Sequence, residues 1–346
     1  MLRFIKYRSI ENSYREKFIN MVREHEYDAP DIKWVATEKI HGGNFSVWVD
    51  KDEIKPAKRT SFIEKDEFFF NYELIMEKYS EDARKLYKYF KNIHPNLNQI
   101  AIFGELFGGT YPHPDVSNDK CGKKVQKGIY YCPHNELYIY DILLIFDDNT
   151  KNRHVTWTEL IESLTYTKSK LKTPKVLFIG TFDEMIALPN DELSEVYKDF
   201  DLPPIEDNIM EGYVFMPVED LYFRDKSRVA FKNKNKKWEE KTKAPKKQLK
   251  EVNEAIKPIV EEISMYVTEN RLRNVLSHIG EITNKDFGLL NKEFIADVMK
   301  DYIEENGSDA LNVLVKKDRK LINKNVGKQT AQLIGANFLN ILDNEY

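Results

Sequence analysis

Lys39 lies in a polar stretch, residues 37–44 (TEKIHGGN), that places a lysine amine beside histidine, asparagine and glycine. Runs that alternate large apolar and small residues flank it at 34–36 and 45–49, a period typical of half-buried strands. Two such strands would form a hairpin, and an ordinary surface turn can carry a lysine at its tip. A lysine amine is a nucleophile only when it is unprotonated, a state that burial or neighbouring cations favour. Both interpretations, charged turn and nucleophile, stay open at this point.

Two other lysines could supply the neighbouring cations. Lys232 and Lys234 alternate in the run 228–234 (RVAFKNK), so both side chains lie on one face of a strand. A solvated sheet face would explain them equally well. If they are functional, they would bind phosphates and help to keep Lys39 neutral.

Three acids, Glu105, Asp141 and Glu211, lie in or beside apolar, strand-like runs. A buried carboxylate must be paired, hydrogen-bonded or bound to a metal, and a single one is usually structural. Three of them near basic residues predict a site for a nucleotide and a divalent cation, because Mg²⁺ binds carboxylates and substrate phosphates. Arg59 adds a planar fork suited to phosphate. Tyr140 would point away from Asp141 in a regular strand, so stacking of its ring on a base would require a local bend.

The elements that must position these residues are short strands mixed with helices. Strand-like runs occupy 34–36, 45–49, 99–106, 136–146, 211–218 and 228–234, and helical spacing with charged faces occupies 67–93 and 156–171. Because βαβ-type repeats are few, this order favours an α+β domain with antiparallel sheets flanked by helices over a parallel doubly wound sheet.

The character of the sequence changes after the last of these runs. Nine lysines and two glutamates occur between Lys232 and Lys250, and apolar residues then recur every three or four positions. We predict a mixed domain at 1–244 and a small all-helical domain at 245–346.

Composition limits the remaining possibilities. The 346 residues carry a formal net charge of −4, with 41% apolar and 32% charged residues, which are values of a globular protein large enough for two domains. No apolar run is long enough to span a membrane and the first residues lack a signal-peptide pattern, so we expect a soluble protein without a membrane partner. The two cysteines, Cys121 and Cys132, indicate a reducing compartment. Together with His113 and His134 they lack the close pairs usual in zinc sites.

Six short motifs follow one another along the chain: EKIHG, KRTSF, FGELFGG, YIYDI, EGYVF and VAFKNK. This ordered set resembles the nucleotidyl motifs of the covalent nucleotidyltransferase superfamily, whose catalytic domain is an ATP-grasp-like ligase fold. In detail the chain resembles the phage RNA ligase 2 and kinetoplastid RNA-editing ligase family, through the residues after Lys39, the N-terminal stretch 7–19 and the helical tail 266–288. Gly43 and Tyr140 stand where the phage enzymes often have threonine and phenylalanine, and neither departure removes an essential group.

The resemblance implies a role for each matching residue. The implied catalytic residues are Lys39, His41, Arg59, Glu211, Lys232 and Lys234. The implied nucleotide-binding residues are Glu38, Lys39, Asn44, Arg59, Glu105, Tyr140, Glu211, Lys232 and Lys234. The residues implied to bind Mg²⁺ or Mn²⁺ are Glu105, Asp141 and Glu211. Glu38 would read the adenine edge, Tyr140 would stack on the base, and the glycines after Lys39 would let the backbone approach the nucleotide.

The implied activity is that of an ATP-dependent RNA ligase joining 3′-OH and 5′-phosphate ends, preferentially at nicks in duplex RNA, through lysyl-AMP and AMP-capped RNA. We expect a monomeric, cytoplasmic protein, with a viral or phage origin as an option. A catalytically silent RNA-binding protein of the same fold is the alternative, although the lysine and the motif acids are all present. A DNA ligase or a capping enzyme would carry an oligonucleotide-binding barrel where this chain has predicted helices.

Two further segments could contact RNA or be plain surface. One is the segment 107–135, which is longer than in the compact phage enzyme and contains Lys120, Lys123, Lys124 and Lys127. The other is a predicted helix with Arg271, Arg273, Asn274 and His278, which could face the phosphates and 2′-hydroxyls of an A-form duplex.

Overall fold

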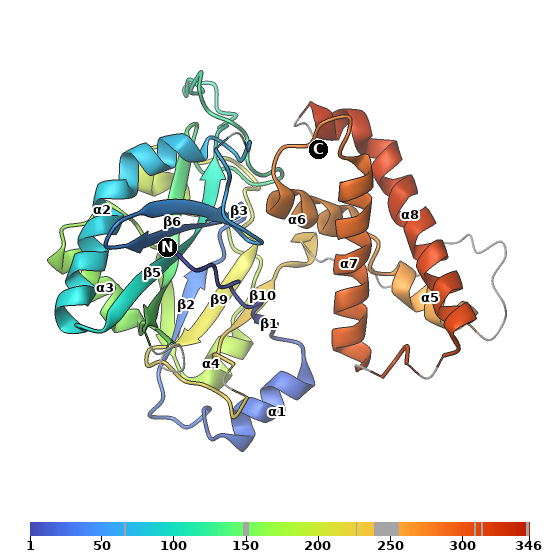
Figure 1. Cartoon of the computed structure of the whole chain (residues 1–346), viewed down its shortest axis with the longest axis horizontal. Coiled ribbons are helices and arrows are strands. Elements are labelled where there is room, and N and C mark those ends of the chain that lie inside the picture. The colour runs from blue at the N-terminus through green and yellow to red at the C-terminus, as the bar shows by residue number, and fades with distance from the viewer. Residues whose placement is uncertain are drawn as a thin grey trace. The chain divides into compact units, whose positions relative to one another are not determined.

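A computed structural model of the chain describes residues 1–65, 67–147, 152–225, 227–238, 256–307, 309–312, 314–343 and 346. It divides into two compact units, Met1–Asn235 and Lys236–Tyr346 (Figure 1). The first mixes helices with antiparallel-rich sheets and the second contains helices, which confirms the predicted fold class. The predicted boundary at 244/245 lies outside the described residues. Within the described ranges, no helix is long and apolar enough to cross a lipid bilayer.

The first unit contains two five-stranded sheets, here called sheet A and sheet B. Sheet A has the strand order β1 (Glu11–Asn12), β10 (Phe231–Lys234), β9 (Gly212–Pro217), β2 (Trp34–Glu38) and β8 (Val176–Gly180). Sheet B has the order β4 (Ile54–Lys58), β3 (Gly43–Asp50), β5 (Leu97–Gly108), β6 (Asn135–Phe146) and β7 (Arg153–His154). All neighbours are antiparallel except β1 and β10, which are parallel.

Sheet B is buried on both faces, and the alternation seen in the sequence of β3 explains how. Phe45, Val47 and Val49 point to one face and pack in a core with helix α2 (Tyr72–Ile93) and helix α3 (Trp157–Tyr166). Trp48 points to the other face, which the N-terminal segment at 2–7 covers. The N-terminal segment therefore lies on the same face of sheet B as Asn44 and Ser46.

Aromatic side chains cover sheet A. Trp34 packs on Phe182 of helix α4 (Phe182–Ala187) and on Phe231, with ring centroids 5.2 and 5.6 Å apart. Phe18 of helix α1 (Glu16–Glu24) adds a ring 5.5 Å from that of Phe231. Short 3₁₀ turns occur at Val196–Phe200 and Lys236–Trp238.

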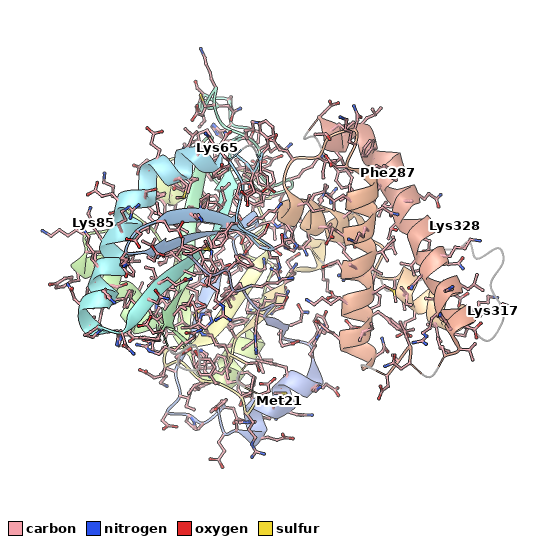
Figure 2. The ribbon with its side chains drawn as sticks, viewed as in Figure 1. Met21, Lys65, Lys85, Phe287, Lys317 and Lys328 are labelled. Atoms are coloured by element: carbon pink, nitrogen blue, oxygen red, sulfur yellow. The ribbon has the colours of Figure 1, made fainter. Side chains whose placement is uncertain are left out.

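The second unit packs helices α5 (Lys257–Ser264), α6 (Glu269–Ile279), α7 (Phe287–Asn306) and α8 (Lys316–Leu342) around their own apolar core. The apolar spacing at 310–322 and at 330–342 predicts two separate helices, but α8 continues through Gly327 and Gly335 without a break. Its core side chains, among them Val326 and Ile334, keep one helical face buried, while Lys317 and Lys328 project away from it (Figure 2).

Arg271 does not face outward as an RNA-binding side chain would. It is 2% exposed, and its Nη1 lies 2.7 Å from Asp297 and 2.8 Å from Asp301 of α7. Arg273 pairs with Glu269 at 3.2 Å on its own helix. Arg271 is therefore neither an RNA-facing nor a solvated side chain, because it is buried in ion pairs of the helical unit.

The segment 107–135 is folded onto the first unit. Asn135 holds the backbone of Lys123 through two hydrogen bonds of 2.6 and 2.9 Å. Tyr111 and Tyr131 are fully buried. Gly109 adopts a positive φ of +89°, and a β-carbon there would lie 1.9 Å from the carbonyl oxygen of Lys123. RNA contact by the lysines of this segment stays a prediction.

Candidate active site

Lys39 lies where the chain crosses from sheet A to sheet B. It follows β2, which pairs with β8 and β9, and precedes β3, which pairs with β4 and β5. The hairpin expected from the sequence is thus wrong, because the two strands belong to different sheets. The Lys39 backbone N–H donates to the carbonyl oxygen of Gly212 at 2.8 Å, so sheet A fixes the position of this residue.

Gly42 makes this crossing possible. A β-carbon at this position would lie 2.2 Å from the carbonyl oxygen of Leu106 in β5, closer than two such atoms can approach. The resemblance to ligases suggested that glycine serves the approach of a nucleotide, but in the structure the close neighbour of Gly42 is the protein backbone.

A buried carboxylate, Glu211, gathers the basic groups of the site. Its Oε2 accepts a hydrogen bond of 2.6 Å from Lys39 Nζ and lies 3.2 Å from His41 Nδ1, while its Oε1 lies 3.0 Å from Lys234 Nζ. The side chain is 2% exposed. Burial alone would raise the pKa of Glu211, but Lys234, Lys39 and His41 outweigh burial and hold this pKa well below its usual range.

Strand pairing explains why these side chains meet. In the register of β9 and β10, Lys234 lies opposite Gly212, directly after Glu211, and Lys232 lies opposite Val214. Alternation along β10 puts both lysines on one face, as the sequence predicts.

Glu38, the residue before Lys39, is also buried, with 2% exposure. Burial raises its pKa to about 7, against the lowering effect of hydrogen bonds from the Ser194 side chain and the Glu195 backbone. Its Oε1 has no hydrogen-bond partner within the described part of the chain. An unpaired buried acceptor is unfavourable, so this oxygen is suited to receive a donor from a ligand.

Sheet B contributes the opposite side of the site. Asn44 on β3 lies opposite Glu105 on β5, and its Nδ2 donates to the hydroxyl of Tyr140 on β6. Burial raises the pKa of Glu105 to about 7; the charges of Lys39 and Arg59 oppose this rise and the Glu211 carboxylate adds to it. The Arg59 guanidinium donates to Ser9 Oγ at 2.7 Å.

Tyr140 occupies a β-bulge. Phe103 pairs with Asp141 and the next residue, Gly104, pairs with Ile139, so Tyr140 is left over between them. A bulge re-aims a side chain relative to a regular strand. The local bend that a stacking role of Tyr140 requires is therefore present.

Asp141 is not brought to the other predicted metal ligands. Its Oδ2 accepts hydrogen bonds from Tyr7 at 3.0 Å and Arg228 at 2.5 Å, and lies 2.7 Å from His154 Nδ1. Within the described ranges, no group of three or more His, Cys, Asp or Glu side chains could hold a metal ion. Among the contacts of the described residues, Asp141 meets neither Glu105 nor Glu211, and the largely buried Arg228 neutralises it instead.

Sequence reasoning missed two residues beside the site. Tyr131, from the segment 107–135, accepts the His41 backbone N–H at 2.9 Å, and no motif or spacing signals it. Arg228 donates a hydrogen bond to Asp141. A charged residue at the start of the apolar run 228–234 is the sequence feature that could have indicated a buried ion pair.

Two protein-family models match the sequence. The model described as RNA ligase matches residues 32–234, and the model described as T4 RNA ligase 2 C-terminal matches residues 249–332. Among individual proteins, the mitochondrial RNA-editing ligase 2 of Trypanosoma brucei brucei is 27% identical over 384 residues, which cover 91% of this chain and 87% of that protein. The mitochondrial RNA-editing ligase 1 of the same organism is 23% identical and covers 90% of this chain and 79% of that protein.

Solved structures show a weaker likeness. The apo form of a variant RNA ligase of Naegleria gruberi aligns with 69% of this chain and 58% of its own chain, with 17% identity and a TM-score of 0.45. A second variant of a Naegleria gruberi RNA ligase, with ATP and Mn, gives a TM-score of 0.41 at 16% identity and also aligns over 58% of its own chain. These scores support no conclusion about activity. The RNA ligase model, in contrast, matches more than half of the sequence and includes Lys39, Glu211 and Lys234. This chain belongs to the RNA ligase family.

Proposed function

We propose that this protein is an ATP-dependent RNA ligase that joins RNA 3′-OH and 5′-phosphate ends, preferentially at nicks in duplex RNA. The observation that carries the proposal is the cluster in which a buried Glu211 holds the amines of Lys39 and Lys234 at 2.6 and 3.0 Å. Membership of the RNA ligase family supports the same activity, as do the two trypanosome relatives, which are named RNA-editing ligases.

The first step is the transfer of AMP to Lys39. After Nζ has lost its proton, it forms a bond to the α-phosphorus of ATP while the bond between that phosphorus and the oxygen bridging to the β-phosphorus breaks, and pyrophosphate leaves. Lys232 and Lys234 share the β10 face beside Glu211 and would neutralise the charge that develops on the α-phosphate. A covalent lysine carrier divides one difficult condensation into easier displacements.

The nucleoside would be held between the two sheets. Tyr140 would stack on the base, and the unpaired Oε1 of Glu38 would accept a donor from the adenine edge. Glu105, with its raised pKa, would bind the ribose hydroxyls. Arg59 and Asn44 would orient phosphates.

The donor set fits a divalent cation only in part. Glu211 would contribute one carboxylate once Nζ of Lys39 has turned from Oε2 toward phosphorus, and ATP phosphates would supply the remaining oxygens, as is common for Mg²⁺. The cation would neutralise charge on the phosphates during transfer. Asp141 takes no part in this set.

Two further steps complete ligation. AMP passes from Lys39 to the RNA 5′-phosphate, and the RNA 3′-OH then attacks that capped end and expels AMP. A helical unit matched by the T4 RNA ligase 2 C-terminal model supports engagement of a nicked duplex. A monomeric state and a cytoplasmic location stay predictions.

The test begins with enzyme stripped of bound AMP by pyrophosphate. Incubation with α-labelled ATP and Mg²⁺, without RNA, is expected to give acid-labile, alkali-stable label on the protein, and addition of nicked duplex RNA is expected to move this label to RNA 5′ ends and then release it as AMP. Lys39→Ala is expected to abolish labelling. Absence of label with intact RNA binding would instead favour the silent RNA-binding alternative.

Substrate preference needs a matched series. A nicked RNA duplex is expected to be sealed faster than the same two ends in single strands and faster than the same nick in duplex DNA. Equal rates on all three would refute the preference for nicked RNA while leaving the ligase chemistry intact.

A further inference from the structure

The two sheets carry different parts of the proposed site. Sheet A and its flanking residues bring the nucleophile Lys39, Glu211 and the lysines of β10, whereas sheet B brings Asn44, Glu105 and Tyr140. Adenylyl transfer requires the base and the α-phosphate to be held together, because a displacement of about 1 Å at a reacting centre can lower a rate by about 100-fold. A rigid link between β6 and β10 would meet this requirement.

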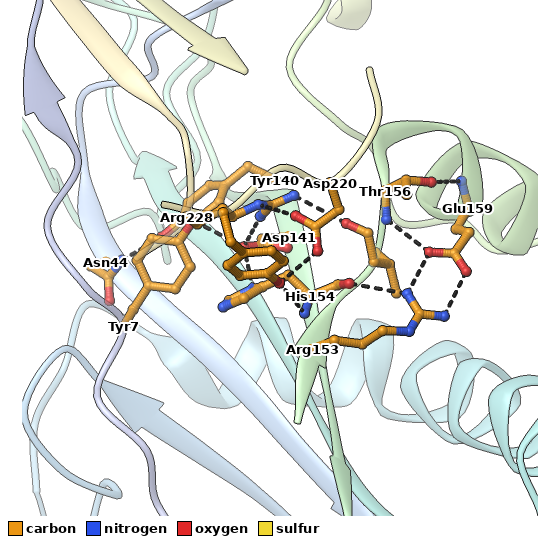
Figure 3. A network of polar contacts seen from close by, with 12 residues as sticks. Tyr7, Asn44, Tyr140, Asp141, Arg153, His154, Thr156, Glu159, Asp220 and Arg228 are labelled. Atoms are coloured by element: carbon orange, nitrogen blue, oxygen red, sulfur yellow. Dashed lines mark hydrogen bonds and ion pairs between the residues drawn. The ribbon is translucent and has the colours of Figure 1, made fainter. Parts of the chain in front are cut away.

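Arg228 forms such a link (Figure 3). It lies just before β10, yet Nη1 donates to Asp141 of β6 at 2.5 Å and Nη2 donates to the carbonyl oxygen of Val155 at 3.0 Å. Nε lies 2.8 Å from Asp220 Oδ1. Two guanidinium nitrogens of Arg228 therefore donate hydrogen bonds to different acceptors and the third forms an ion pair with Asp220, an arrangement that a lysine ammonium cannot reproduce.

The acceptor that Arg228 fixes lies directly after the bulged residue Tyr140. Asp141 is 1% exposed and Arg228 is 14% exposed, so the pair is shielded from water. Tyr7 closes the cluster, because its hydroxyl donates to Asp141 while its ring lies 5.5 Å from that of Tyr140. The Tyr140 ring thus lies next to a side chain that hydrogen-bonds to Asp141, the partner of Arg228.

We propose that Arg228 is a positioning residue that holds Tyr140, and with it the nucleotide base, in register with the lysines of β10. The inference rests on the proposed function, since it assigns Tyr140 to the base and Lys232 and Lys234 to the α-phosphate. Arg228 touches neither substrate nor the reacting atoms and acts through Asp141.

The experiment is a double-mutant cycle on the rate of protein labelling by α-labelled ATP, at saturating ATP, with the full chain. Arg228→Lys is expected to lower this rate by about 10- to 100-fold. In a Tyr140→Ala background the same change is expected to lower it by no more than about twofold, since residues that act as one unit are not additive. Thermal unfolding of each variant verifies that it is folded.

Arg153→Lys is the matched control. Arg153 belongs to the same polar region but binds Glu159 through two hydrogen bonds of 2.7 Å and makes no contact with Asp141 among the interactions described (Figure 3). The labelling rate of the Arg153→Lys variant is expected to stay within about twofold of the wild-type rate, because Arg153 lies outside the link between Arg228 and Asp141. If Arg228→Lys does not fold, the isosteric Asp220→Asn replaces it, since Asp220 contacts both Arg228 and the hydroxyl of Tyr222.

The outcomes separate the two proposals. Wild-type protein that takes up no label overturns the proposed function and this inference together. If wild-type protein takes up label and the Arg228→Lys variant takes it up equally fast, the role of Arg228 alone is overturned. The same holds if Arg228→Lys lowers the labelling rate equally in the Tyr140 and Tyr140→Ala backgrounds. A loss confined to the background that retains Tyr140 supports the positioning role.

Discussion

At the scale of single residues, the site depends on one carboxylate that neutralises several cations. Glu211 is the common partner of Lys39, Lys234 and His41, and all contacts lie within 3.2 Å. Without its charge the ammonium groups of Lys39 and Lys234 would repel one another in a largely buried environment. Glu211 therefore stabilises the fold around Lys39 and, under the proposed function, also takes part in the chemistry.

Glu211→Gln tests this dual role. The neutral side chain is expected to lower the labelling rate by at least about 100-fold and the free energy of unfolding by about 3 kcal/mol, the usual result of removing one member of a buried ionic group. Urea denaturation and the labelling assay measure the two effects. Glu206→Gln, at an exposed position, is the control and is expected to change stability by less than about 0.5 kcal/mol. Equal behaviour of the two variants would contradict the assignment.

Glu38 and Glu105 predict a pH dependence of stability. Burial raises both pKa values from 4.5 to about 7, so between these pH values the folded protein holds protons that the unfolded chain has released. The contribution of these two carboxyl groups to the free energy of unfolding is therefore fully present below pH 4.5 and is lost as the pH rises through about 7. The low pKa of Glu211 gives the opposite slope near pH 4.5, where the unfolded chain still holds part of the proton that the folded protein has released, and no slope at higher pH, where Glu211 is ionised in both states.

The free energy of unfolding, measured by urea at several pH values between about 5 and 8, checks this prediction. Glu38→Gln and Glu105→Gln are each expected to flatten part of the decline with rising pH relative to wild type. Parallel curves for wild type and both variants would show that neither carboxyl titrates in this range.

At the scale of elements, the site is made where β2 leaves one sheet and β3 enters the other. The crossing requires Gly42, and the bulge in β6 aims Tyr140. Both are backbone features that place side chains without contributing chemistry themselves.

Gly42→Ala is expected to lower the free energy of unfolding by at least about 2 kcal/mol and to reduce labelling sharply, because the new methyl group would displace the backbone of β5. Gly335→Ala is the control. Nothing lies within 4 Å of a β-carbon at that exposed helical position, so this variant is expected to gain up to about 1 kcal/mol. A Gly42→Ala variant with unchanged stability and labelling would show that the backbone of β5 can shift at little cost in free energy.

Much of this element plan could be predicted from the sequence, and the rest could not for physical reasons. The runs at 45–49, 99–106 and 136–146 are strands because alternating or continuous apolar residues bury sheet B from both sides. The strand β8 was missed, since it is short and its burial does not alternate. Alternation marks strands but not their partners, so β2 and β3 were taken for a hairpin.

The candidate site was predictable to the extent that it depends on local order. Lys39, Glu211 and Lys234 follow one another in recognisable motifs, and the structure brings them together. Asp141 also belongs to a motif, but its environment depends on Arg228, a partner far away in the sequence. Only the fold reveals that this acid is already neutralised.

At the scale of the whole molecule, two units divide the chain, and each has its own core. The net charge of −4 reflects many acids that neutralise lysines and arginines within the protein. Arg271 is an example, because two aspartates hold it inside the helical unit.

Arg271→Leu is expected to destabilise the helical unit by about 3 kcal/mol, since it leaves Asp297 and Asp301 without their buried partner. Hydrogen exchange measured by mass spectrometry should accelerate in α6 and α7 while β5 and β6 stay protected. Arg319→Leu, at an exposed position of α8, is the control and is expected to leave exchange unchanged. Faster exchange throughout the first unit as well would contradict the claim that the cores of the two units are stabilised independently.

The most direct measurement of the central claim is to locate the adenylyl group. Wild-type protein stripped of AMP would be incubated with ATP and Mg²⁺, digested at alkaline pH and mapped by mass spectrometry. We predict AMP on the peptide that contains Lys39, and none in Lys39→Ala protein. AMP on a different residue, or an unmodified Lys39 peptide under conditions in which RNA ends are sealed, would contradict the account.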